Sequence, residues 1–135
     1  MKSTIRFSSV KPEFYSTLNQ RVNDYFKNGD ISRNGNAEMV VKTLVMFTLY
    51  LVPYALIITS TVTNIWAMFG LCVLMGVAVG GIGLSVMHDA NHGAYSSNKT
   101  INSLLGHTLN LLGGSVFNWK LQHNVLHHTY TNIVK

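Results

Sequence analysis

All six histidines of the chain lie between positions 88 and 128. Five of them form two compact sets: a first histidine set, His-Asp-Ala-Asn-His at 88–92, and a second histidine set, His-Asn-Val-Leu-His-His at 123–128. On a helix, His88 and His92 are one turn apart and share a face, so their imidazole nitrogens can converge on one ion. Neutral imidazole suits iron, zinc and copper near physiological pH. The first set therefore predicts a metal site.

The second histidine set repeats this spacing. On an α-helix, His123 and His127 are one turn apart, and His128 lies about 100° further round. Imidazoles spread over such a wide arc suit two ions better than one. The predicted metal ligands are His88, His92, His123, His127 and His128. His107 stands alone in an apolar stretch, and we interpret it as a packed or hydrogen-bonded residue rather than a ligand.

Asp89 directly follows the first histidine of the first set. Its carboxylate could orient the imidazole of His88 by accepting a hydrogen bond from the ring nitrogen that does not bind the metal. The alternative is a carboxylate at the end of a helix that is simply exposed to water. The residue pattern leaves both interpretations open.

Two long apolar stretches precede the histidines. Hydrophobic residues make up 47% of the chain and charged residues only 11%, against about 25% charged in soluble proteins. Residues 44–62, which contain Pro53, and residues 67–87 each approach the roughly 20 residues that cross a hydrocarbon core. Trp66, in the short connection between them, suits a headgroup-level anchor. We predict two transmembrane helices, with the first histidine set at a membrane boundary.

Small residues are frequent in the second apolar stretch, namely Gly70, Gly76, Gly80, Gly81 and Gly83. Gly76 and Gly80 form a small-xxx-small pair, which allows two helix backbones to approach closely. We interpret these glycines as helix-packing positions. The single cysteine, Cys72, excludes an intramolecular disulfide.

Basic residues indicate the orientation in the membrane. Seven of the ten precede the first apolar stretch: Lys2, Arg6, Lys11, Arg21, Lys27, Arg33 and Lys42. The remaining three, Lys99, Lys120 and Lys135, follow the second stretch. Because Lys and Arg collect on the cytoplasmic side, both histidine sets are predicted to lie there. The net charge of +5 includes no basic cluster, so we expect no nucleic acid partner, and residues 1–40 contain no signal-peptide apolar region.

An amphipathic helix is predicted near the N-terminus. Phe14, Leu18, Val22 and Phe26 recur at every fourth residue, and Asn28-Gly29 is a helix stop. The helix either packs against the rest of the protein or lies on the cytoplasmic membrane surface. A later stretch, residues 101–117, is too short and too polar for a span, and we expect an interfacial or membrane-dipping helix there.

At the histidine sets the sequence resembles the membrane-bound fatty acyl desaturase family, which is known by histidine boxes of the forms H-x(3,4)-H and H-x(2,3)-H-H. The run Met87-His-Asp-Ala-Asn-His-Gly-Ala-Tyr95 is similar to the first box and its surroundings. The run from Asn118 to Asn132 is similar to the second box. Within the family, these runs resemble those of bacterial linoleoyl-CoA or front-end desaturases.

The resemblance implies an all-α integral membrane protein. It would comprise a cytosolic segment with the amphipathic helix at 1–43, followed at 44–135 by the N-terminal part of a four-span desaturase domain with helical histidine boxes. In that family the boxes hold two non-haem irons on the cytosolic side, which implies iron ligation by the five predicted histidines. Asn124 and Trp119 fall within the matching run, and supporting roles beside the ligands are implied for them.

The family pattern continues beyond what is seen here. A third histidine box and a second pair of spans are absent from residues 1–135, as is a fused cytochrome b5 domain. We therefore expect the N-terminal part of a longer protein, inactive by itself, because five histidines cannot complete a site that the family builds with eight or more ligands. Electrons would come from a separate ferredoxin or cytochrome b5-type donor.

The implied function of the full-length protein is fatty acyl desaturation. Dioxygen would be the co-substrate, a cis double bond in a lipid acyl chain the product, and the membrane the source of the substrate. One alternative is a histidine-box oxygenase such as an alkane or carotenoid hydroxylase. Others are a membrane electron carrier that binds haem through two histidines, and a non-enzymatic membrane segment whose histidines only solvate the interface.

Overall fold

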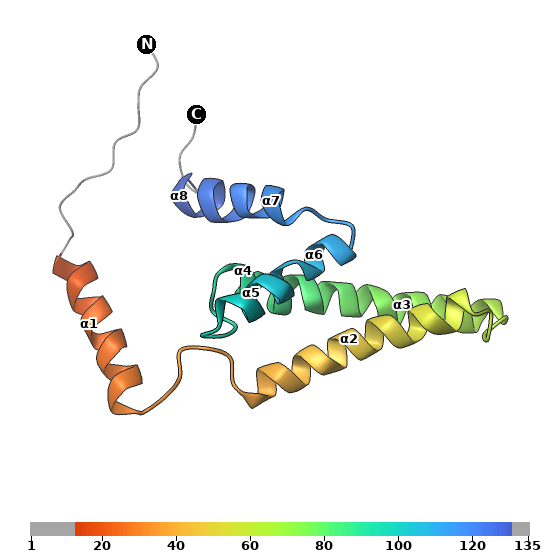
Figure 1. Cartoon of the computed structure of the whole chain (residues 1–135), viewed down its shortest axis with the longest axis horizontal. Coiled ribbons are helices and arrows are strands. Elements are labelled where there is room, and N and C mark those ends of the chain that lie inside the picture. Colours follow the sequence, from red (N-terminus) through yellow and green to blue (C-terminus); the bar gives the residue numbers. More distant parts are fainter. Residues whose placement is uncertain (1–12, 131–135) are drawn as a thin grey trace, which may run out of the picture. The chain divides into compact units, whose positions relative to one another are not determined.

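The computed structural model describes residues 13–130, and every regular element within that range is a helix (Figure 1). The chain divides into two compact units between Arg33 and Asn34. The described part of the first unit contains one helix. The second contains two long helices and, after them, the short helices that carry the histidine sets. The predicted all-helical fold class is confirmed.

Helix α1, Glu13–Asn28, is the predicted amphipathic helix. It ends where expected, since the amide of Gly29 donates to the Tyr25 carbonyl at 3.1 Å and the following Asp30 adopts a positive φ of 49°. The guanidinium of Arg33 then folds back over the Phe26 ring, 5.3 Å from its centroid. No residue of α1 is buried, and Phe14 is 76% exposed. The two interpretations of its apolar face both remain open.

Helix α2, Ala37–Ile58, contains the first predicted span but is displaced toward the N-terminus. It begins before residue 44 because the side chain of Asn36 caps it, accepting from the amide of Met39 at 3.1 Å. It ends before residue 62 because Ser60 adopts a left-handed φ of 54°. Pro53 lies inside the helix and is buried. The apolar pattern thus identified the span, while the polar caps set its ends.

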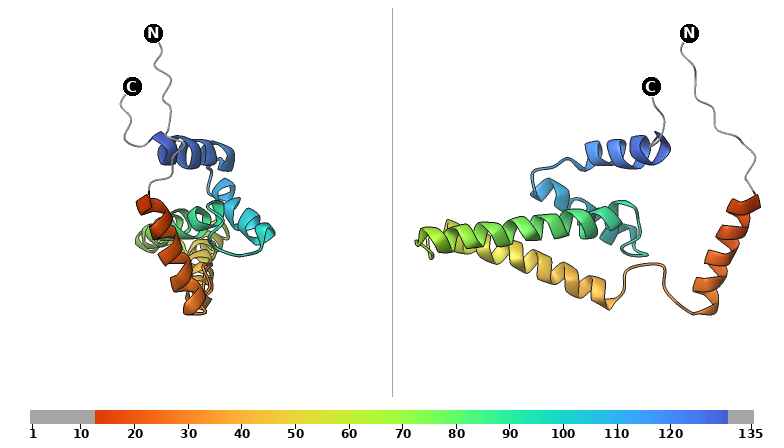
Figure 2. Two further views of the ribbon diagram at one scale, coloured as in Figure 1. Left: turned by 90° about the vertical axis from the view of Figure 1, so that its left-hand side faces the viewer. Right: turned by 180° about the vertical axis from the view of Figure 1, so that it is seen from behind.

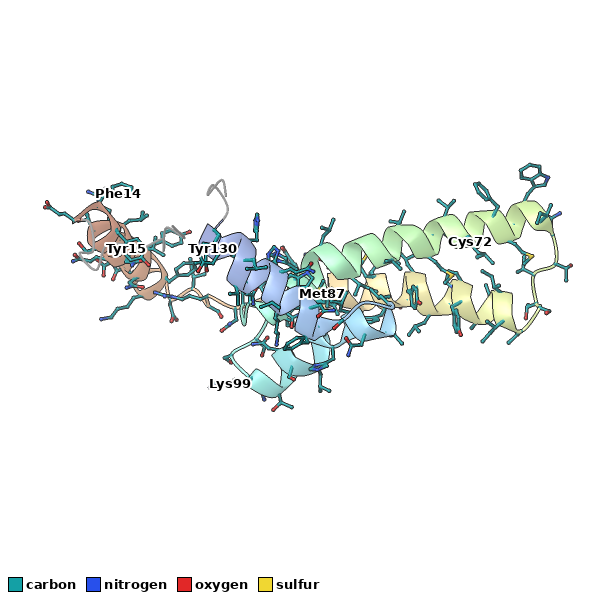
Figure 3. The ribbon with its side chains drawn as sticks, turned by 90° about the horizontal axis from the view of Figure 1, so that it is seen from above. Phe14, Tyr15, Cys72, Met87, Lys99 and Tyr130 are labelled. Carbon is teal, nitrogen blue, oxygen red and sulfur yellow. The ribbon has the colours of Figure 1, made fainter. Side chains whose placement is uncertain are left out.

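Helix α3, Ile65–Gly81, starts at an Asn64 cap that accepts from the amides of Trp66 and Ala67. It continues through a π-helical segment η1, Ile82–Val86, into α4, Met87–Asn91. Ala37–Ile58 and Ile65–Asn91 are both long and apolar enough to cross a membrane, and both are largely unburied within the protein. Helices α2 and α3 lie side by side in antiparallel directions (Figure 1). Many of their side chains, Cys72 among them, are exposed on the outside of the pair (Figure 3).

Of the glycines predicted to pack helices, Gly81 lies at the contact between α2 and α3, and the pair Gly76 and Gly80 does not. A methyl group added at Gly76 or Gly80 would meet no atom of the described residues within 4 Å, so these two glycines do not mediate the contact between α2 and α3. The close approach occurs instead at Gly81, where an added carbon would collide with the Met46 side chain of α2. A small-xxx-small pattern shows that backbones could approach but not which face does so.

A small core joins the helix pair to the first histidine set. It consists of Ile82, Val86, Ala90 and Tyr95, packed by Met39, Met46, Phe47, Tyr50, Leu105 and Leu112. The Tyr95 hydroxyl lies 2.8 Å from the Thr43 hydroxyl, a buried hydrogen bond. The Tyr95 carbonyl accepts from the Gly35 amide at 3.0 Å. The loop after the first histidine set is thereby fixed to the start of α2.

The predicted interfacial helix at 101–117 is broken into shorter pieces. Helix α5, Lys99–Gly106, and helix α6, Thr108–Leu111, are followed by a turn in which Gly113 has a φ of 87°. Asn110 closes this turn by accepting from the Val116 amide at 3.0 Å. Helix α7, Val116–Trp119, then runs into a second π-helical segment η2, Lys120–His127, and into α8, His128–Tyr130, as one rod (Figure 2).

The packing at Gly81 generates a matched pair of substitutions. Gly81→Leu should lower the free energy of unfolding of the chain in detergent micelles by about 1–3 kcal/mol, because the new side chain overpacks against Met46. Gly76→Leu should leave it nearly unchanged, because that position is open. Circular dichroism melting of both variants measures the difference. Equal effects at the two glycines would contradict the contact.

Candidate metal centre

The first histidine set sits at the end of the long helix formed by α3, η1 and α4. His88 lies in α4 and is half-buried, while His92 caps the C-terminus of α4 and is exposed. Their ring centroids are 4.6 Å apart. The chain then leaves through Gly93, whose φ of 74° favours glycine, and the amide of Ala94 donates to the Asp89 carbonyl at 2.8 Å. The predicted shared face of His88 and His92 is therefore confirmed.

The second histidine set lies on a π-helix, not on the α-helix assumed from its spacing. In η2 the hydrogen bonds run from residue i to i+5, so His128 follows His123 by about one wide turn. The two ring centroids are 4.8 Å apart, and the His128 ring lies 5.0 Å from that of His92. The assumption of an α-helix at the second histidine set is therefore wrong, and the wider helix brings His128 back beside His123.

The two sets meet at their imidazole nitrogens. Nε2 of His88 and Nε2 of His123 are 3.2 Å apart although the residues are separated by 35 positions. With His92 they form the one group in the described part of the chain whose potential metal-binding atoms all lie within 4.8 Å of one another.

The other histidines lie at different distances from this group. His127 is in ring contact with His123 and His128, at 5.3 and 5.4 Å between centroids. Neither His127 nor His128 brings a nitrogen into the group of three, although the ring contacts make all five one cluster. His107 stands apart, with Nδ1 donating to the Ser103 carbonyl at 2.7 Å. The interpretation of His107 as a hydrogen-bonded residue is confirmed.

Asp89 lies where it can fix the tautomer of its neighbour. Its Oδ1 is 3.2 Å from Nδ1 of His88. An ionised carboxylate only accepts hydrogen bonds, so the proton of a neutral His88 resides on Nδ1. Nε2 then presents its lone pair toward His123, which is the form of imidazole that can bind a metal ion.

Trp119 and Asn124 both contact the cluster or its backbone. The Trp119 indole stacks on His123 with centroids 4.4 Å apart and planes at 22°, and it meets His88 and His92 edge-on at 5.6 Å. The side-chain amide of Asn124 donates to the Asn91 carbonyl at 3.4 Å. Its Oδ1 is buried and has no hydrogen-bond partner among the described residues.

Asn91 is a residue that sequence reasoning missed. Its carbonyl receives Asn124, and its own side-chain amide donates to the Gly106 carbonyl at 3.4 Å. A side chain at Gly106 would collide with Asn91. Asn91 therefore ties the first histidine set to α5 and to η2. The position of Asn91 within the first histidine set was the only sign in the sequence that it could matter. The spacing of the histidines did not predict a structural role for it.

Histidine pKa values are depressed inside the cluster. Burial lowers the pKa of His92, and repulsion from His88 and His128 lowers it further, while Asp89 acts in the opposite direction. Burial also lowers the pKa of His123, followed by repulsion from the four other histidines of the two sets. Both effects favour the neutral, ligand-competent form of His92 and His123.

Comparison with known proteins decides the family. Residues 64–135, more than half of the chain, match the family described as fatty acid desaturase. The chain belongs to the fatty acid desaturase family. The predicted resemblance is thus confirmed, and the matched segment contains both histidine sets and the whole cluster.

Relatives named as desaturases align with most of the chain. It is 39% identical over 130 residues to the sn-1 linoleoyl-lipid 6-desaturase of Synechocystis sp., which covers 96% of this chain and 36% of the relative. It is 36% identical over 121 residues to the enzyme of the same name from Arthrospira platensis, and the alignment covers 90% of this chain and 33% of the relative. It is 32% identical over 133 residues to the acyl-lipid (8-3)-desaturase of Physcomitrium patens, and that alignment covers 98% of this chain and 28% of the relative. The chain thus spans about a third of the length of these relatives, and no solved structure matches it significantly.

The depressed pKa values give a titration experiment on the metal-free chain. His92 and His123 should titrate below the ordinary histidine value, and the folded cluster should lose stability as the pH falls below about 6.5, because the unfolded chain binds the protons more tightly. His128→Gln should raise both midpoints by removing a repelling neighbour. NMR of labelled histidine side chains in chelator-treated protein measures the shifts. His107→Gln is the control, and midpoints unmoved by His128→Gln would show that the rings do not interact.

Proposed function

We propose that this chain supplies part of the iron site of a fatty acyl desaturase, which introduces a cis double bond into a lipid acyl chain with dioxygen as co-substrate. The observation that carries the proposal is the convergence of His88, His92 and His123 from the two histidine sets. It occurs in a chain of the fatty acid desaturase family, within the segment that defines the match.

The donor set fits iron. Imidazole nitrogens bind first-row metal ions such as zinc at about 2.0–2.1 Å, so two nitrogens on one ion lie roughly 3 Å or slightly more apart. The 3.2 Å between Nε2 of His88 and Nε2 of His123 agrees with this spacing. Neutral imidazole suits iron chemically. We assign His88, His92, His123, His127 and His128 as ligands to a pair of non-haem irons.

Each neighbour of the ligands has a defined task in this proposal. Asp89 keeps the proton of His88 on Nδ1 and so orients Nε2 toward the ion. Asn91 and Asn124 hold the backbones of the two sets together. When bound, the iron pair would activate dioxygen, the oxidant of the reaction. Dioxygen takes two electrons and two protons from the donor side and two hydrogens from a –CH₂–CH₂– unit, which leaves a cis –CH=CH– unit and two waters.

The substrate and its setting follow from the apolar helices and from the relatives. The relatives compared above are named as lipid-linked desaturases, which supports an acyl chain carried on a membrane lipid. The two membrane-capable helices support a position of the cluster at the end of a span, within reach of such a chain. The distribution of basic residues supports a cytoplasmic position for the cluster, where a ferredoxin or a cytochrome b5-type protein would deliver electrons.

The proposed reaction is tested with the full-length gene product in membranes, supplied with an electron donor. Gas chromatography with mass spectrometry should reveal a new cis alkene in membrane acyl chains. His88→Ala and His123→Ala should abolish both bound iron and product, whereas His107→Ala should retain both, because His107 lies outside the cluster. An alcohol product would indicate a hydroxylase instead. A Soret absorption band with iron held in porphyrin would indicate a haem protein.

The ligand count predicts a separate behaviour for residues 1–135 expressed alone. We expect this chain to bind a divalent metal ion through its convergent histidines but to produce no alkene, because five imidazoles leave two irons incompletely ligated. Metal analysis and product analysis on one purified sample measure both. Desaturation by this chain alone would contradict the assigned ligand count.

A further inference from the structure

Trp119 contacts every member of the convergent histidine group. Its indole stacks on His123 at 4.4 Å between centroids, nearly parallel at 22°. It also meets His88 and His92 edge-on, at 5.6 Å from each and at steep interplanar angles of 86° and 69°. No other aromatic side chain except histidine is recorded in ring contact with these three imidazoles in residues 13–130.

The local backbone presents this indole in a fixed place. Trp119 ends α7, and its amide donates to the Ser115 carbonyl at 2.9 Å. The Ser115 hydroxyl caps the same helix by accepting from the Asn118 amide at 3.3 Å. The π-helical segment starts at the next residue, Lys120. Trp119 and His123 therefore project from one continuous rod, one turn apart, which explains how their rings can stack.

The ring plane of His123 is restricted mainly by stacking and not by hydrogen bonds. Nδ1 of His88 is oriented by Asp89. Within residues 13–130, the side chain of His123 forms one hydrogen bond, which joins its Nε2 to Nε2 of His88. A metal ion would take both of those Nε2 lone pairs and so break that contact. The plane of His123 would then depend on the rings stacked against it. Trp119 stacks at 4.4 Å between centroids, closer than His127 at 5.3 Å, so the indole is the nearer of the two stacked rings.

We propose that Trp119 is a positioning residue that sets the plane of the His123 imidazole for metal binding, and that its fluorescence reports the ion held there. The inference rests on the proposed function, since it assumes that the histidines bind metal. Trp119 is half-buried and is not part of the core formed by Ile82, Val86, Ala90 and Tyr95. Its replacement should therefore change the site without unfolding the chain.

The chain offers a matched control, because its only other tryptophan, Trp66, lies at the beginning of α3. Along a helix rising 1.5 Å per residue, Trp66 is about 30 Å from His88. A Trp66→Phe variant leaves Trp119 as the single fluorophore. A Trp119→Phe variant keeps an aromatic face on His123, and Trp119→Leu removes it.

The experiment titrates Co²⁺ into the purified chain in detergent, followed by visible absorption of the ion and by tryptophan fluorescence. In Trp66→Phe, Co²⁺ should quench the remaining emission in step with binding, and a chelator should restore it. Trp119→Leu should weaken Co²⁺ binding about tenfold, within the 10–100-fold range for groups that orient metal ligands. Trp119→Phe should recover affinity to within about threefold, and circular dichroism should show unchanged helix content throughout.

The outcomes separate the two proposals. Normal Co²⁺ affinity in Trp119→Leu, or binding without quenching in Trp66→Phe, overturns the role of Trp119 and leaves the metal site intact. Weakened binding in both Trp119→Leu and Trp119→Phe, with helix content preserved, also overturns stacking as the cause. If the unmodified chain does not bind Co²⁺, the proposed metal site and the Trp119 inference are both overturned. The same holds if His88→Ala and His123→Ala bind Co²⁺ as tightly as the unmodified chain does.

Discussion

Nε2 of His88 and Nε2 of His123, 3.2 Å apart, connect two segments that have few other polar links. One segment ends a membrane-capable helix, and the other lies within the rod formed by α7, η2 and α8. Around this contact the structure adds the Asn124 to Asn91 hydrogen bond and the stacked face of Trp119. Burial and repulsion from neighbouring imidazoles both lower the pKa of His92 and of His123. These two rings therefore favour the neutral state, which is also the state in which an imidazole binds a metal ion.

A π-helical segment, a form that is rare and concentrates at functional sites, adjoins or contains each histidine set. Segment η1 directly precedes α4, which carries the first set, and η2 contains His123 and His127 of the second. Segment η1 lies in the buried core through Ile82 and Val86, and the Ser85 hydroxyl donates to the Gly81 carbonyl at 2.7 Å within it. The packing of those two side chains offsets the poorer backbone geometry of a wide turn. Segment η2 has no buried residue. Its geometry is accompanied instead by the ring contacts of His123 with His127 and His128.

The sequence was sufficient to predict the helical class, both membrane-capable helices, the amphipathic α1 and the shared face of His88 and His92. It misplaced the ends of α2 because hydropathy averages over a window, whereas Asn36 and Ser60 act through single hydrogen bonds or dihedral angles. Apolar periodicity also contains no information that distinguishes an α-turn from a π-turn, so the position of His128 could not be foreseen. The Gly81 contact depends on which face of α3 meets α2, and that depends on side-chain volumes in both helices.

The positions of buried apolar surface indicate which parts of the chain lipid would stabilise and which parts contacts within the protein stabilise. The two membrane-capable helices bury little of themselves within the protein, and the buried core is confined to the histidine end. A hydrocarbon environment would cover the exposed apolar side chains of α2 and α3 and so hold the pair in place. The histidine cluster lies at and beyond the end of the second membrane-capable helix, where the protein supplies contacts of its own. It depends on directional contacts, namely the Tyr95 to Thr43 hydrogen bond, the Asn91 links and the indole of Trp119. A change on the lipid-facing surface should therefore leave the geometry of the histidines intact, while loss of a single directional contact acts on that geometry directly.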